Sequence, residues 1–328
     1  MSTRPGSLIL TVTRDCNLRC SYCPTAKDGW PSLSIPDVQR AIDLFVDVYG
    51  GGDIKIFGGE PLLVPAVVRA AMEHAAQREG VRRVYLSTNG LGLTAEWLAF
   101  LRSYPKGILT LSMDGMPEDH RRMRRALPGV EDTYDRVMSM LPALLETPRL
   151  VVTQTIAPAT AYRAADNFKH LLSLGFRRFN LLPGYYLPWR AAQLDALRSG
   201  FAAIQVEFER RWSVDRYIYL RNLFTWAPTP FFNTGLVVDA DRSIHPSNVG
   251  LSGALDHLRE QTRVGSLDNP PSLTELRAQT AVVNDVLADA LPENIRHATA
   301  AVDAELTALC RALYPSFVAY RRRRRGAA

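Results

Sequence analysis

The sequence is poor in cysteine and has no long apolar run, and each absence excludes a class of protein. Only 4 of its 328 residues are Cys, which is too few for a fold held together by disulfides. No apolar run approaches the roughly 20 residues of a membrane-spanning helix, so we expect no membrane partner. The N-terminal residues contain a single Arg and run directly into a strand-like segment, unlike a secretory signal. A cytoplasmic protein is therefore expected.

A charge surplus is also nearly absent from the body of the chain. There are 39 Lys and Arg residues against 33 Asp and Glu, a net charge of +6, but five of the positives form the run 321–325. Without that run the net charge is +1, since 6 − 5 = 1. We interpret residues 321–328 as a solvated basic tail, with a contact to an acidic partner as the alternative. There is little to support a nucleic-acid partner.

Short apolar segments rich in β-branched residues alternate with longer segments of helical periodicity. The candidate strands are 8–13, 53–57, 83–87, 108–112, 150–156 and 178–182. The candidate helices are 35–49, with Ser34 as its N-terminal cap, 64–79, 94–103, 134–145, 162–174 and 190–212. Six β–α units in strict alternation predict parallel strands with right-handed crossovers, in a partial barrel or an open, doubly wound sheet.

The pattern changes after about residue 215. Residues 216–224 are aromatic and strand-like, and 236–239 with 243–245 predict a hairpin. Residues 272–314 are rich in Ala and Leu and are typical of helix, with a break at Pro292. We therefore predict a β/α module at 1–214, a C-terminal α+β appendage at 215–320 and the basic tail at 321–328.

Cys16, Cys20 and Cys23 lie in one loop after the first candidate strand, with the spacing C-x3-C-x2-C. Thiolates this close repel one another, and a bound metal stabilises their deprotonated forms. A structural zinc needs a fourth ligand, and the next His is His74. Three thiolates alone suit an iron–sulfur cluster with one iron left open. Zinc with a distant fourth ligand is the alternative.

The loop Cys16-Asn17-Leu18-Arg19-Cys20-Ser21-Tyr22-Cys23 resembles the signature of the radical S-adenosylmethionine (radical SAM) enzymes. Three later segments match the family in the same order, each at the carboxyl end of a candidate strand, where β/α barrels bind ligands. They are FGGEP at 57–61, STNG at 87–90 and SMDG at 112–115. Over residues 8 to about 185, the resemblance implies a partial (β/α)6 TIM-like barrel that holds a [4Fe–4S] cluster and S-adenosyl-L-methionine (SAM).

The resemblance also implies roles for the matched residues. The three clustered cysteines would bind three irons, leaving the fourth to the amine and carboxylate of SAM. The carboxylate of Glu60, brought close by the preceding glycines, would accept from the SAM amine. Arg124 would pair with the SAM carboxylate, with Arg121, Arg122 and Arg125 as competing candidates. The implied SAM-binding residues are Gly58, Gly59, Glu60, Pro61, Ser87, Asn89, Ser112, Asp114, Arg124 and Pro183.

The implied chemistry is that of the family. An external electron donor reduces the cluster, SAM is cleaved, and the resulting 5′-deoxyadenosyl radical abstracts hydrogen from the substrate. The cofactor carries the difficult step, while the protein binds, orients and excludes water. A non-catalytic metal-binding interaction module is the remote alternative, which the matches to a SAM pocket disfavour.

Residues 231–247 resemble the first hairpin of the SPASM or twitch extension, which holds auxiliary clusters in enzymes that modify peptides. The cysteines of that hairpin are missing, with Phe232 and Ser247 near their positions. Only Cys310 remains, so thiolates cannot ligate an auxiliary cluster, and we expect the appendage to close the barrel and shape the pocket. Core packing is favoured over pocket roles for Tyr185, Tyr186, Trp189, Tyr217, Tyr219, Trp226 and His245.

The hairpin favours a ribosomally made peptide as substrate, modified by epimerisation or cross-link formation. Because only seven residues precede the first strand, we expect direct binding or a separate leader-peptide-binding protein. The alternative substrate is a small metabolite, such as a sugar or amino acid, changed by epimerisation, dehydration or dehydrogenation. Cys310 is interpreted either as a hydrogen donor or as a small hydrophobe in a helix, and we favour the second.

Overall fold

The computed structural model describes residues 6–27, 29–225, 235–248 and 252–326. Its contacts divide the chain into two compact units. The first unit comprises Met1–Leu111, Arg124–Leu150 and Pro230–Ala290, and the second comprises Ser112–Met123, Val151–Thr229 and Leu291–Ala328. The predicted boundary at residue 214 stays a prediction, because compact units of contacts need not be separate domains.

A mainly parallel sheet forms the core of the first unit. Its strand order is β12 (Gly265–Ser266), β11 (Ser243–His245), β10 (Leu236–Val238), β1 (Ser7–Thr13), β3 (Gly52–Gly58), β4 (Val81–Thr88) and β5 (Gly107–Ser112). Strands β10, β1, β3, β4 and β5 pair in parallel, whereas β10 with β11 and β11 with β12 pair antiparallel. Leu8 and Leu10 of β1 and Ile54 and Ile56 of β3 are fully buried, as expected for parallel strands covered by helices.

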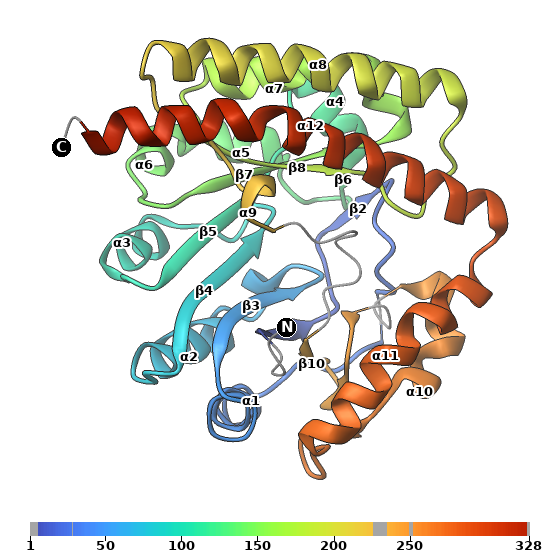
Figure 1. Ribbon diagram of the computed structural model, residues 1–328. Coiled ribbons are helices and arrows are strands. Elements are labelled where there is room, and N and C mark those ends of the chain that lie inside the picture. Colours follow the sequence, from blue (N-terminus) through green and yellow to red (C-terminus); the bar gives the residue numbers. More distant parts are fainter. Residues whose placement is uncertain (1–5, 28, 226–234, 249–251, 327–328) are drawn as a thin grey trace. The chain divides into compact units, whose positions relative to one another are not determined.

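Helices α1 (Ile35–Asp47), α2 (Pro65–Ala76) and α3 (Ala95–Ser103) lie along the strands of this sheet (Figure 1). The predicted cap of α1 is confirmed: Ser34 accepts from the Asp37 N–H, and the Asp37 carboxylate accepts from the Ser34 N–H at 2.9 Å. The other helices of the first unit are η1 (Pro61–Leu63), α5 (Thr133–Ser139), α6 (Leu141–Leu145), η5 (Gly253–Leu258), α10 (Arg259–Thr262) and α11 (Leu273–Ala290).

The first unit also contains a small antiparallel pair that the sequence pattern did not predict. Strand β2 (Leu18–Cys20) pairs with β6 (Arg124–Ala126), and Cys20 lies opposite Arg124. Each strand has only three residues and mixes Arg with apolar or sulfur side chains, so it lacks the alternation that marks a strand. The pair joins the cysteine loop to the segment after α4 (Pro117–Met123).

The second unit contains the parallel strands β7 (Val151–Ile156), β8 (Arg178–Pro183) and β9 (Tyr219–Leu220). Helices α8 (Ala191–Ser213) and α12 (Glu293–Gly326) lie side by side (Figure 1). Trp212 of α8 packs its ring 5.6 Å from that of Phe317 and 6.1 Å from that of Tyr320, both on α12. The helices of this unit are α4 (Pro117–Met123), η2 (Pro158–Arg163), α7 (Ala164–Ser173), α8 (Ala191–Ser213), α9 (Asn222–Thr225) and α12 (Glu293–Gly326).

All six strands predicted within residues 1–214 are confirmed, and two other predictions are wrong. Residues 134–145 form two helices, because Pro142 lacks the N–H that one continuous helix needs. Residues 216–224 contain only the two-residue β9 and then α9. There the side-chain amide of Asn222 bonds both backbone groups of Leu181, at 2.9 Å each, and takes the place of a longer strand.

The C-terminal predictions are refined in two ways. The predicted hairpin is present as β10 and β11, but it extends the sheet of β1. The arginine run continues α12, and Arg321–Arg324 are exposed on that helix. Residues 231–234 and Trp226 lie outside the described residues. Among the helices of the described residues, none combines the length and apolar content needed to cross a membrane.

Candidate functional site

The three clustered cysteines are half-buried in and around β2, and local hydrogen bonds fix their loop. The guanidinium of Arg19 donates to the Cys16 carbonyl at 2.9 Å, and the Cys23 N–H donates to the Cys20 carbonyl at 3.1 Å. The sulfur atoms also have partners: Cys16 Sγ accepts from the Leu18 N–H, and Cys23 Sγ accepts from Lys27 Nζ at 3.3 Å. Part of the shape of the loop therefore comes from its own backbone and side chains.

The thiols of this loop differ in acidity. Burial raises the pKa of Cys16 above its ordinary value, against the opposing Leu18 N–H. Burial also acts to raise the pKa of Cys23, but the Lys27 ammonium and hydrogen bonds from Thr25 and Lys27 outweigh it and hold that pKa below its ordinary value. The Cys23 thiolate is thus stabilised by a neighbouring positive charge.

The donor set suits a cluster better than a single ion. In the described part of the chain, no three His, Cys, Asp or Glu side chains are gathered closely enough to hold one metal ion. The thiolate ligands of an iron–sulfur cluster bind different irons, so they surround the cluster and need not converge on one ion. Three soft thiol ligands in one short loop fit that arrangement.

Glu60 precedes η1 as its cap, and it is only 1% exposed. Its Oε1 accepts from the Leu62 N–H at 3.0 Å and the Thr88 hydroxyl at 2.7 Å, while Oε2 accepts from the Asn89 N–H at 2.7 Å. Burial raises the pKa of Glu60 above its ordinary value, although these donors and the charge of Arg124 oppose it. Because a carboxylate oxygen accepts about two hydrogen bonds, Oε2 retains room for one more donor.

Gly58 and Gly59 allow Glu60 to approach the cysteine loop. Gly58 has φ +147°, and a Cβ on Gly59 would lie 2.1 Å from the Asp15 carbonyl oxygen. The Gly59 N–H donates to the Thr13 carbonyl at 2.9 Å, and the Glu60 N–H donates to the Asp15 carbonyl at 2.8 Å. These backbone bonds lock the end of β3 against the residues before Cys16, and the buried Pro61 then starts η1.

Asn89 joins the third matched segment to the same loop. Its side-chain amide donates to Asn17 Oδ1 at 2.7 Å, within the cysteine loop, and Ser87 lies half-buried two residues earlier in β4. Arg124 reaches the loop from β6, with its guanidinium 5.4 Å from the centroid of the Tyr22 ring. The first unit therefore brings together the cysteines, residues 58–61, Asn89 and Arg124.

The competing arginines have other surroundings. Arg122 bonds the Asp119 carboxylate at 2.9 Å and the Ala159 carbonyl at 3.0 Å, and Arg125 is exposed. Of the matched segments, Asp114 and Pro183 belong to the second unit, and Ser112 stands where β5 ends. Asp114 is buried there, accepts from the Thr155 N–H at 3.1 Å and donates its own N–H to His120.

The aromatic candidates and Cys310 are mostly part of the core. Tyr185 is buried and bonds Asp303 at 3.2 Å, and the Trp189 indole donates to the Gly184 carbonyl at 2.7 Å. His245 is buried too, and burial lowers its pKa to about 4. Cys310 is 6% exposed in α12, and burial raises its pKa to about 11. These surroundings favour the small-hydrophobe interpretation of Cys310.

The remaining aromatic candidates lie at or near the surface of the second unit. Tyr217 is exposed, and its hydroxyl bonds the Arg178 guanidinium at 2.5 Å. The ring of Tyr219 stacks on Phe224 with centroids 5.2 Å apart. Tyr186 has φ +60°, and its N–H donates to Thr299 Oγ1 at 3.0 Å. None of these contacts identifies a substrate pocket among the described residues.

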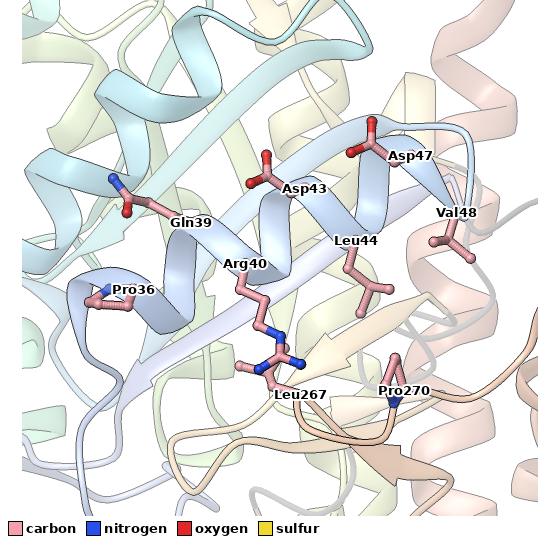
Figure 2. A pocket seen from close by; sticks show the side chains of 9 residues that line it. All are labelled: Pro36, Gln39, Arg40, Asp43, Leu44, Asp47, Val48, Leu267 and Pro270. Atoms are coloured by element: carbon pink, nitrogen blue, oxygen red, sulfur yellow. The ribbon is translucent and has the colours of Figure 1, made fainter.

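A groove on α1 is separate from these residues (Figure 2). Arg40 extends from α1 toward the segment before α11, where it pairs with Asp268 at 3.2 Å. The groove is lined by Pro36, Gln39, Arg40, Asp43, Leu44, Asp47, Val48, Leu267 and Pro270. None of the matched residues lines it.

Sequence reasoning missed several residues that hold the site. Thr88 donates to Glu60 and lies inside the matched segment 87–90. Lys27 donates to Cys23 and lies four residues after it. Arg14, directly before the cysteine loop, forms a buried ion pair with Asp239. These two residues are 225 positions apart, and no local pattern connects them.

Comparison with known proteins identifies the relatives of this chain. Residues 10–157 match the family model described as the Radical SAM superfamily. GTP 3′,8-cyclase 1 of Mycobacterium tuberculosis is 29% identical over 171 residues, which are 49% of this chain and 45% of that protein. The chain thus spans less than half the length of this curated relative.

Solved structures of anSMEcpe resemble most of the chain. With bound AdoMet the TM-score is 0.67 at 17% identity, over 89% of this chain and 84% of that one. With bound AdoMet and the Cp18Cys peptide the TM-score is 0.65 at 17% identity, over 88% and 83%. At this identity the likeness concerns the fold, and it confirms the predicted class, a partial β/α barrel with C-terminal helices.

Proposed function

We propose that this chain, whose residues 10–157 match the model of the Radical SAM superfamily, is an enzyme that holds one [4Fe–4S] cluster through Cys16, Cys20 and Cys23 and binds SAM beside it. The family uses both cofactors, and the donor set of the cysteine loop fits the first. When bound, the reduced cluster and SAM supply radical chemistry at an unactivated C–H bond of the substrate.

The observation that carries this proposal is the attachment of Glu60 and Asn89 to the cysteine loop. Glu60 bonds the Asp15 carbonyl through its N–H, and Asn89 bonds Asn17 through its amide. A buried carboxylate with one remaining acceptor position is thereby fixed beside the thiols. An ammonium group suits that position, since it supplies both the missing donor and the countercharge.

Arg124 completes the arrangement from β6. Its pairing with Cys20 across β2 and β6 holds its backbone in place, and its buried side chain lies beside Tyr22. A guanidinium in this position suits a carboxylate, to which it can donate two parallel hydrogen bonds. We therefore assign the amino group of SAM to Glu60 and its carboxylate to Arg124.

Reductive cleavage of SAM tests the proposal. The protein is reconstituted without oxygen with iron and sulfide, dithionite and SAM are added, and 5′-deoxyadenosine and methionine are measured. Cys16→Ala, Cys20→Ala and Cys23→Ala should each abolish iron loading and cleavage, and Cys310→Ala is the matched control that should retain both. Absence of 5′-deoxyadenosine from well-loaded protein would sink the proposal.

For the substrate, we propose a ribosomally made peptide. The support is the extent of the fold likeness to anSMEcpe, which includes the C-terminal half of the chain and a structure that contains a peptide. The hairpin β10–β11 belongs to that half. Peptides encoded beside this gene should be altered in mass or stereochemistry by the reconstituted protein, and a reaction in deuterated water separates epimerisation, which takes up deuterium, from cross-linking.

A small metabolite is the second candidate, favoured by the similarity to GTP 3′,8-cyclase 1 in sequence. That similarity covers 49% of the chain, so it supports a shared cofactor domain more than a shared substrate. The two candidates are compared directly by measuring substrate-dependent cleavage of SAM with neighbouring peptides and with GTP. Acceleration by GTP alone would replace the peptide proposal.

A further inference from the structure

We propose that the hairpin β10–β11 holds the cysteine loop in place, and that Arg14 and Asp239 are positioning residues for the cluster. This inference rests on the proposed function, because it concerns the cluster that the loop would bind. The residues that carry it are Arg14, Trp30, Asp239, Asp241 and Arg259, which are called the ion network. All of them belong to the first unit.

The guanidinium of Arg14 is fully buried, and its contacts define its orientation. Its exposed fraction is 0%, its Nε donates to Asp239 Oδ1 at 3.1 Å, and its Nη2 donates to the other carboxylate oxygen. The guanidinium also lies 3.5 Å from the centroid of the Trp30 ring. A buried arginine is tolerated only where its partners have good geometry, so this contact fixes the chain two residues before Cys16.

The sheet brings Asp239 to this position. Strand β10 pairs in parallel with β1, with Leu236 opposite Leu8 and Val238 opposite Leu10. Asp239 directly follows β10, so it meets the chain that emerges from β1. Its carboxylate also accepts from the Ala240 N–H at 2.7 Å, which holds the side chain where the hairpin turns.

Arg259 closes the network from α10. Its guanidinium lies 4.8 Å from the centroid of the same Trp30 ring, pairs with Asp241 and donates to the Ser243 hydroxyl at 2.7 Å. Its Nε is 3.6 Å from Asp239. Two guanidiniums therefore contact the Trp30 ring, and Asp239 and Asp241 pair with them. Because Arg14 and Asp239 are both buried, removal of either one leaves the charge of the other without its main partner.

Movement of Arg14 would disturb both the cysteine loop and the turn that carries Glu60. The Arg14 carbonyl would lie 2.3 Å from a Cβ on Gly59, which means that the backbone of the cysteine loop rests against the Gly-Gly turn before Glu60. The hairpin itself offers no cysteine at residues 235–248. We therefore assign it the role of an electrostatic clamp on the loop.

The first test uses metal-free protein and does not depend on activity. Hydrogen–deuterium exchange of residues 14–23 is compared in Asp239→Asn, Arg14→Gln and a control, Asp268→Asn. Asp268 pairs with Arg242 of the hairpin at 2.6 Å but is 62% exposed. We expect both network variants to exchange at least about tenfold faster in this segment, with α8 and α12 unchanged, and the control to match the unmodified protein.

The second test uses the reduction potential of the reconstituted cluster. The reduced cluster carries one more negative charge, so Asp239→Asn, which leaves Arg14 unneutralised, should shift the potential to less negative values. Arg14→Gln leaves a carboxylate and should shift it to more negative values. A double variant, Arg14→Gln with Asp239→Asn, removes both charges and should return toward the unmodified potential. A merely structural defect has no reason to produce shifts of opposite sign.

Two outcomes overturn the inference. Unchanged exchange of residues 14–23 in both network variants shows that the hairpin does not hold the loop. Shifts of the potential in the same direction show that the charges act only through general loosening. If the unmodified protein binds no cluster, the proposed function fails, and the exchange experiment still decides whether the hairpin clamps the loop.

Discussion

At the scale of single residues, Glu60 combines deep burial with three hydrogen-bond donors. We predict that Glu60→Gln weakens SAM binding at least about tenfold, because an amide carries no charge to attract an ammonium group. Gln also keeps only one acceptor oxygen, so its NH2 group would face at least one of the donors Leu62, Thr88 and Asn89. Equilibrium dialysis of reconstituted protein measures the affinity, and Glu73→Gln, at an exposed ion pair with Arg69, is the control. Loss of iron with unchanged SAM affinity would contradict the assigned role.

The raised pKa of the Cys310 thiol predicts how its reactivity depends on pH. Burial raises its pKa to about 11, and only the thiolate reacts with iodoacetamide. Between pH 7 and 10 the thiolate fraction should rise about tenfold per pH unit, and labelling should remain on the order of a hundredfold slower than that of glutathione at pH 8. Peptide mapping by mass spectrometry measures this. Rapid labelling at pH 7.5 would instead favour the hydrogen-donor interpretation.

At the scale of elements, the Gly-Gly turn after β3 controls how closely Glu60 approaches the cysteine loop. We predict that Gly59→Ala lowers the stability of the metal-free protein by about 1–3 kcal/mol and reduces iron loading, because its Cβ would overlap two carbonyl oxygens. Thermal unfolding and iron analysis measure both effects. Gly6→Ala is the control, since no atom lies within 4 Å of its Cβ. Equal stability of the two variants would show that the turn has room to adjust.

Elements with a clear period could be predicted from the sequence, whereas those defined by a distant partner could not. Helix α1 carries its own evidence in Ser34, Asp37 and the apolar positions from Val38 to Phe45. Strand β9 does not, because Asn222 determines where it ends by bonding Leu181, 41 residues earlier. The three-residue strands β2 and β6 likewise exist only as a pair.

At the scale of the whole molecule, the same division holds for the candidate site. The cysteines, Glu60 and Asn89 stand in motifs whose spacing can be read from the sequence, and the structure gathers them in the first unit. The supporting contact between Arg14 and Asp239 joins residues 225 positions apart through the pairing of β10 with β1. To predict such a contact, the order of the strands in the sheet must be known, and the hydrophobic periodicity of the sequence does not determine that order.

The four cysteines of these 328 residues lead to a prediction for the number of clusters that the chain binds. Three cysteines lie in one loop, and Cys310 is alone and buried in the second unit, so thiolates can ligate one cluster only. We predict about four iron and four sulfide atoms per chain after anaerobic reconstitution, with a single electron paramagnetic resonance signal after reduction. Cys310→Ala should leave both unchanged. A content of about eight irons that falls in Cys310→Ala would mean that a second cluster is bound, and that the C-terminal half supplies ligands as well as the electrostatic clamp.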